Sequence, residues 1–109
     1  MNRIILALYL ALSSIAANAG TGSGLVKIQF VGKFGGHDIV FFFTDSHESA
    51  PSCNDYKSRW ALDISTDLGR AQYSLLLSAQ AQSKPVVING SAICNLYANS
   101  ETVAHVGFK

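Results

Sequence analysis

Hydrophobic and polar residues alternate along several short segments of the chain, which predicts a mainly β protein. In residues 59–65, Trp60, Leu62 and Ile64 fall on one face of an extended chain, the pattern of a half-buried strand. Similar alternations, and runs of β-branched or aromatic residues, mark further segments of this kind. The expected strands are residues 25–34, 37–44, 59–65, 86–88 and 101–108.

The segment between the third and fourth expected strands has the composition of a helix. Residues 68–82 are rich in Ala, Leu and Gln and contain no proline. Thr66 and Asp67 supply N-cap chemistry before them, and Lys84-Pro85 ends the segment. The resulting order, β-β-β-α-β-β, is that of an OB-fold, a five-stranded Greek-key barrel that is partly open, although other small α+β sheets share this count. The composition of residues 20–24 predicts a flexible lead-in to the first strand. Surface loops are expected at residues 45–58 and 91–100.

The N-terminal segment has the features of a cleavable signal peptide. Residues 1–3 carry a positive charge, residues 4–15 are apolar, and Ala17-Asn18-Ala19 matches a small-x-small cleavage site. We therefore expect residues 1–19 to be removed and residues 20–109 to form a single domain. The alternative is an uncleaved membrane anchor, but the apolar run is shorter than the roughly 20 residues that a membrane span needs.

Two cysteines, Cys53 and Cys94, bracket the predicted strand–helix–strand unit. In an exported chain such a pair is expected to form one structural disulfide. A reactive or metal-bound thiol pair is the alternative. It is disfavoured because the sequence has no C-x-x-C motif and no histidine close to either cysteine.

The balance of charge excludes some classes of partner. The chain has eight Lys and Arg residues and seven Asp and Glu residues, and removal of Arg3 with the signal peptide leaves a formally neutral domain. A nucleic-acid-binding protein needs a basic stripe to release counterions, and a polybasic membrane-surface protein needs excess lysine and arginine. We expect neither nucleic acid nor a membrane surface as the partner.

A polar group follows the second expected strand, at Asp45, Ser46 and His47. A metal site that also used the neighbouring Glu48 would match no standard ligand spacing, and a solvated loop is the ordinary alternative. Sugars are held by short polar side chains beside an aromatic platform, which Tyr56 and Tyr97 could supply. We take Asp45, Ser46, His47, Tyr56 and Tyr97 as the candidate glycan-binding residues. Trp60 shares its strand face with Leu62 and is expected in the core.

The predicted helix is apolar on more than one face. Leu68, Ala71, Leu75 and Ala79 form a stripe at helical spacing that is suited to capping the barrel. Tyr73, Leu76 and Leu77 then lie elsewhere on the helix and are the candidate residues of an oligomer interface. Coverage of that second face by loops of the same chain is the alternative.

Motifs for catalysis are weak in this sequence. Three histidines and several serines and aspartates permit a hydrolytic triad on paper, but no G-x-S-x-G or comparable nucleophile context accompanies them. No pair of carboxylates is placed as in a glycosidase. We therefore expect a protein that is not an enzyme, with no catalytic residues, no metal and no cofactor.

The features around the cysteines resemble a group of small exported bacterial proteins related to the B subunit of subtilase-type AB5 toxins. They are a loop cysteine before W-x-L-D-I-S, a helix of the A-x-Y-S-L-L-L-x-A-Q-A kind, a K-x-V-x-I-x-G strand, and a second cysteine. Here these are Cys53, residues 60–65, 71–81 and 84–90, and Cys94. The resemblance implies an OB-fold protomer in a homo-oligomeric ring, typically a pentamer with its helices lining the centre. It also implies binding of sialylated or related cell-surface glycans, and a catalytic A subunit as a partner.

The leading hypothesis is a secreted or periplasmic, non-enzymatic binding protein that recognises glycans as a toxin B subunit does. The alternative is a periplasmic OB-fold protein that binds a protein or a small ligand, as an envelope stress factor or inhibitor without a toxin role.

Overall fold

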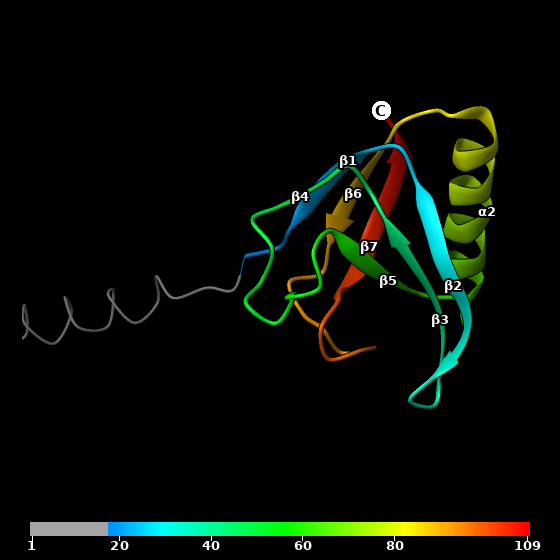
Figure 1. The fold of residues 1–109 in the computed structure, drawn as a ribbon. Coiled ribbons are helices and arrows are strands. Elements are labelled where there is room, and N and C mark those ends of the chain that lie inside the picture. Colours follow the sequence, from blue (N-terminus) through cyan, green and yellow to red (C-terminus); the bar gives the residue numbers. More distant parts are fainter. Residues whose placement is uncertain (1–17) are drawn as a thin grey trace, which may run out of the picture.

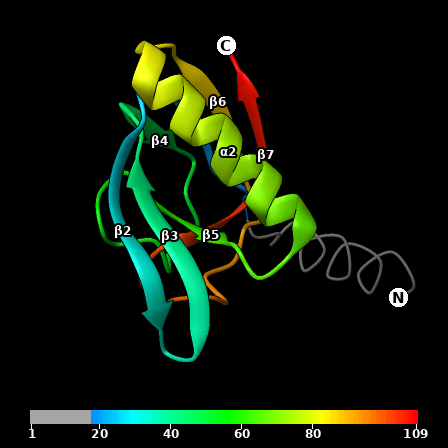
Figure 2. The same ribbon diagram turned by 90° about the vertical axis from the view of Figure 1, so that its right-hand side faces the viewer.

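A computed structural model describes residues 18–109, and the greater part of the expected signal peptide, residues 1–17, lies outside the described residues. Seven strands form one curled, mixed sheet, a half-barrel with a single helix along its open side (Figures 1 and 2). The strands are β1 (Thr21–Gly24), β2 (Lys27–Phe34), β3 (His37–Phe43), β4 (Ser46–Glu48), β5 (Arg59–Asp63), β6 (Val86–Gly90) and β7 (Glu101–Phe108), and the helix is α2 (Asp67–Gln82).

The strands follow the order β2-β3-β5-β7-β6-β1-β4 across the sheet. All neighbouring pairs are antiparallel except β5 and β7, which run parallel and place Trp60 opposite Glu101. This parallel pairing joins the β2-β3-β5 half of the sheet to the β7-β6-β1-β4 half. The beginnings of β5 and β7, which are far apart in sequence, therefore lie side by side.

The expectation of a mainly β protein with one helix is confirmed, but the count of five strands is wrong. The two additional strands, β1 and β4, lie where a flexible lead-in and a loop were expected. Both are short and lack an apolar alternation. They form because their backbones pair with each other and β1 pairs with β6. Gly22 lets β1 lie directly on the core, since a Cβ at this residue would come within 2.7 Å of the Trp60 ring.

The dense apolar run in β3 is explained by burial on both faces of the sheet. Val40 and Phe42 belong to the main core under α2, whereas Ile39 and Phe41 belong to a second cluster on the opposite face, under Leu96. A strand covered on both faces has no need of polar positions. The main core consists of Val26, Val40, Phe42, Trp60, Leu62, Leu76, Ala79, Val86, Ile88 and Val103.

Helix α2 begins and ends with regular caps. The Thr66 hydroxyl accepts a hydrogen bond from the Gly69 amide at 2.9 Å, and Ser83 closes the helix in a left-handed conformation. The face that packs on the sheet contains Gly69, Leu76 and Ala79. The predicted core stripe is confirmed at Ala79, which is buried, and at Leu75, which packs partly against the core. It is wrong at Leu68, which is 66% exposed, and it omits Leu76, which is fully buried.

The disulfide between Cys53 and Cys94 is confirmed, with the two Cα atoms 6.1 Å apart. It joins the loop before β5 to the loop before β7, and it is typical of a protein that folds in an oxidising compartment. Within residues 18–109, no helix has the length and apolar character needed to cross a membrane.

Replacing Gly69 with alanine is expected to lower the free energy of unfolding by about 1–3 kcal/mol, although alanine normally favours a helix by up to about 1 kcal/mol over glycine. The reason is steric, since the added methyl group would overlap the backbone carbonyl oxygen of Asp63. Urea denaturation measures the change. The matched control is Gly107→Ala in β7, where a Cβ meets nothing within 4 Å. Equal stabilities of the two variants would contradict the prediction.

Candidate functional site

A cationic side chain surrounded by aromatic rings lies on the face of the sheet away from α2. Arg59 opens β5, and alternation along the strand turns it to the face opposite Trp60 and Leu62. Its guanidinium carbon lies 3.9 Å from the centre of the Tyr56 ring and 4.2 Å from that of Phe41. The centre of the Tyr97 ring is 5.8 Å away. Arg59 is thus held by stacking on rings from β3 and from both disulfide-linked loops.

The guanidinium N–H groups of Arg59 are held by neutral acceptors. Nε donates to Ser100 Oγ at 2.8 Å, one terminal nitrogen to Gln29 Oε1 at 3.2 Å, and the other to Asn99 Oδ1 at 2.8 Å. Within residues 18–109 no carboxylate forms an ion pair with it. Burial lowers the pKa of the guanidinium below its usual value, and the neighbouring tyrosines Tyr56 and Tyr97 offset part of this effect. The arginine nevertheless remains charged, as in any folded protein.

We call Gln29, Phe41, Tyr56, Arg59, Tyr97 and Asn99 the Arg59 patch. Its accessible part consists mainly of the two tyrosines, since Tyr56 is 39% and Tyr97 is 37% exposed. Each tyrosine stands three residues after a disulfide cysteine, so the disulfide places both rings around the same guanidinium. The rings of Phe41 and Tyr97 also meet edge to face, with centroids 5.1 Å apart. The patch is therefore rigid, amphipathic and positively charged.

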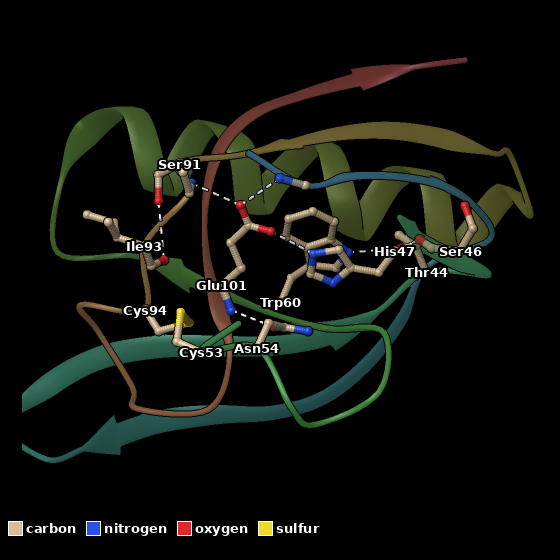
Figure 3. Close-up of polar contacts among 12 residues, drawn as sticks. Thr44, Ser46, His47, Cys53, Asn54, Trp60, Ser91, Ile93, Cys94 and Glu101 are labelled. Atoms are coloured by element: carbon tan, nitrogen blue, oxygen red, sulfur yellow. Dashed lines mark hydrogen bonds and ion pairs between the residues drawn. A yellow bond between two sulfur atoms is a disulfide. The ribbon is translucent and has the colours of Figure 1, made fainter. Parts of the chain in front are cut away.

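A second polar cluster is buried on the other side of β5 and β7, beneath the chain that leads into β1. Glu101, the first residue of β7, is fully buried, and its Oε1 lies 2.7 Å from Nε2 of His47. Its other oxygen, Oε2, accepts hydrogen bonds from the backbone amides of Gly20 and Ala92, both at 2.9 Å. Figure 3 shows the Glu101 side chain reaching between His47 and the backbone. We call these groups, together with Trp60, the Glu101 network.

The imidazole of His47 is stacked flat on the indole of Trp60, with ring centroids 3.6 Å apart (Figure 3). Trp60 in turn donates its indole N–H to the hydroxyl of Thr44 at 2.9 Å. Among the described residues, the His47 Nδ1 atom is the one buried side-chain polar atom that has no hydrogen-bond partner. The network thus lies in the core, out of reach of a diffusing ligand.

The five predicted glycan-binding residues fall in two separate places. Tyr56 and Tyr97 come together in the Arg59 patch, whereas Asp45, Ser46 and His47 face the lead-in chain and β1. Asp45 accepts a hydrogen bond from the Leu25 amide, and Ser46 accepts one from the Ser23 amide. No hydrogen bond or ring contact in the described part of the chain joins these three residues to either tyrosine.

The three predicted interface residues differ in how far they are buried. Leu76 is fully buried in the core of its own chain, and Tyr73 packs partly against that core, so Leu76 is corrected to a core residue. Leu77 is 44% exposed on the outer side of the helix. As for metals, residues 18–109 contain no group of three His, Cys, Asp or Glu side chains placed to share an ion.

The residues that organise both clusters, Arg59 and Glu101, were missed as candidates. Each is a charged residue at the first position of a strand, and this position was the available signal. The role of such a residue depends on partners that are distant in sequence, as Gly20 is 81 residues from Glu101. Comparisons with protein-family models, with curated proteins and with solved structures found no match to this chain.

Proposed function

We propose that the protein is a non-enzymatic binding protein that recognises a glycan through the Arg59 patch. The observation that carries the proposal is a pair of half-exposed tyrosines beside a buried arginine that has no carboxylate partner among residues 18–109. Sugar rings stack their apolar C–H faces on aromatic side chains, while their hydroxyl groups bind to amides and charged groups. The patch offers both kinds of contact side by side.

The positive charge favours an acidic sugar. Arg59 is held by amide and hydroxyl oxygens alone among the described residues, so its charge is left to attract an anion at the surface of the patch. The negative charge of a sialic acid carboxylate complements the positive charge of this patch. The proposal agrees with the resemblance to AB5 toxin B subunits, and a half-barrel with its helix between β5 and β6 is consistent with an OB-fold protomer.

Replacing Tyr97 with alanine is expected to weaken glycan binding about five- to tenfold, because it removes one stacking platform worth roughly 1–1.5 kcal/mol. A glycan array of the chain 20–109 identifies the ligand, and calorimetry then measures the affinity of each variant. The matched control is Phe108→Ala, which removes another exposed aromatic ring at the far end of β7 and should leave the affinity unchanged. Melting temperatures of both variants verify that they are folded.

The array should contain each sialylated glycan beside its desialylated form. We expect binding to the sialylated members and weaker or no binding to their neutral counterparts. Absence of binding to every glycan would refute the proposed function. Equal losses in the Tyr97 and Phe108 variants would refute the assignment to the Arg59 patch.

A protein partner is the second candidate, and one observation favours it. Strand β2 lies at an edge of the sheet and exposes Phe30 and Val31, which are 53% and 50% accessible. Exposed apolar residues on an edge strand are suited to contact with another protein. A negative glycan array would favour this alternative over the glycan receptor.

A further inference from the structure

The backbone of the chain becomes buried at Gly20. Ala19 is exposed, whereas Gly20 is buried against the Glu101 network. The Gly20 amide donates to Glu101 Oε2 at 2.9 Å, and its carbonyl accepts from the Gly90 amide at 2.8 Å. Gly20 is thus the first buried residue of the described chain, and it directly follows the Ala19–Gly20 bond, at which the sequence predicts signal-peptide cleavage.

The carboxylate of Glu101 is fully buried, and its surroundings supply little positive charge. Among the described residues, its one ion-pair partner is His47, and its other bonds come from neutral amides. A protonated imidazole would carry a second N–H at Nδ1, which is buried and has no acceptor within residues 18–109. A buried carboxylate is stable when a full cation pairs with it. The structure therefore has a position for a cation beside Glu101.

We propose that Glu101 is the binding site for the chain's own α-ammonium group, created by cleavage before Gly20. A signal-peptidase-type enzyme would hydrolyse the Ala19–Gly20 bond with one water, leaving a carboxyl group on Ala19 and an amino group on Gly20 that takes up a proton. The nitrogen that already lies 2.9 Å from Oε2 then carries three N–H groups and a positive charge. The mature chain gains a buried ion pair that the precursor lacks. This proposal is independent of glycan binding.

Steric constraints at Gly20 agree with this role. A Cβ on this residue would overlap Glu101 Oε1 and come within 2.7 Å of His47 Nε2. A glycine is therefore required where the new terminus meets the carboxylate. Asn18 lines an open cleft of about 320 Å³ beside the disulfide, together with residues 50–53 and 92–94. Asn18 and Ala19 are both exposed, so a break before Gly20 requires no rearrangement of the core.

The test compares forms of the mature chain that differ only at the N-terminus. One form begins at Gly20, a second begins at Gly20 with an acetyl group, and a third retains Ala19. The acetyl group occupies the place of the Ala19 carbonyl, so it fits and removes only the charge. We expect the free Gly20 form to melt about 5–10 °C above the other two at neutral pH.

Substitution of the carboxylate completes the comparison. In Glu101→Gln the three forms should melt within about 2 °C of one another, because the ion pair is absent in all of them. In the matched control Glu48→Gln, which alters an exposed glutamate of β4, the difference between the forms should persist. Equal melting temperatures of the three wild-type forms, or a difference that survives in Glu101→Gln, would overturn the proposal.

Two further measurements apply even if Glu101→Gln does not fold. The α-amine of native chain 20–109 should react with an amine-selective reagent at least about tenfold more slowly than the exposed α-amine of the form that retains Ala19. Denaturation should abolish this difference. The intact mass of the protein exported from bacteria should correspond to a chain that begins at Gly20. Equal reactivity, or a mature chain that begins elsewhere, would refute the proposal.

Discussion

Replacing Glu101 with alanine is expected to lower the free energy of unfolding by about 3–5 kcal/mol, the usual effect of removing one partner of a buried ion pair. The change leaves the buried amide of Gly20, the part-buried amide of Ala92 and the imidazole of His47 without their shared partner. Because a small domain has only about 5–15 kcal/mol of net stability, this loss would be a large share of it. Urea denaturation at neutral pH, followed by circular dichroism, measures the effect.

The control for this prediction is Glu48→Ala. Glu48 carries the same charge and lies next to His47 in β4, but it is exposed. Its replacement should change the stability by no more than about 0.5 kcal/mol. If the Glu101 and Glu48 variants lost similar stability, the Glu101 network would not be a principal source of stability in this domain.

Removal of the disulfide in the double variant Cys53→Ser/Cys94→Ser is expected to lower the free energy of unfolding by about 4 kcal/mol. The estimate follows from the chain-entropy model for two residues that are 41 positions apart. The same change should weaken glycan binding, because the disulfide places Tyr56 and Tyr97 on either side of Arg59. Denaturation curves and calorimetry with the glycan identified on the array measure the two effects.

Reduction of the wild-type protein provides the control for the second prediction. A thiol reductant should lower the stability of the wild-type chain to that of the double serine variant and should leave the variant unchanged. A double variant with wild-type stability would contradict the structural role of the disulfide. Loss of stability with unchanged affinity would show that the loops hold the tyrosines without the disulfide.

The two clusters are mechanically connected through the beginning of β7. The Glu101 side chain enters the buried network, while its backbone amide donates to Asn54 Oδ1 at 2.7 Å, in the loop that carries Tyr56. Ser100, one residue earlier, accepts the hydrogen bond from Arg59. Disturbance of the Glu101 network is thus expected to reach the Arg59 patch through two consecutive residues, Ser100 and Glu101.

Much of the fold could be predicted from local patterns. Strand β7 has the predicted bounds, 101–108, and helix α2 begins one residue before the predicted start. Alternation of apolar residues, an N-cap threonine and a proline after the helix are signals that depend on neighbours in the sequence. These elements could therefore be identified without knowledge of their partners.

Other elements depend on distant partners and were missed for that reason. Strands β1 and β4 consist mainly of glycine and polar residues, and they exist because their backbones pair with each other and β1 pairs with β6. The phase of α2 was also ambiguous, since apolar residues occupy most of its circumference. Its true orientation follows from the close approach of Gly69 to the backbone at Asp63.

The sequence alone determined the mainly β class of structure, which depends on short spacings, and the disulfide, which follows from having only two cysteines. The tertiary structure decided which charged residues matter. His47 was expected in a solvated or sugar-binding loop and lies in the core, while Arg59 and Glu101 were not singled out. The parallel pairing of β5 with β7 brings Trp60 opposite Glu101 and separates a surface patch from a buried network. Burial of charge depends on that non-local pairing, which no local pattern encodes.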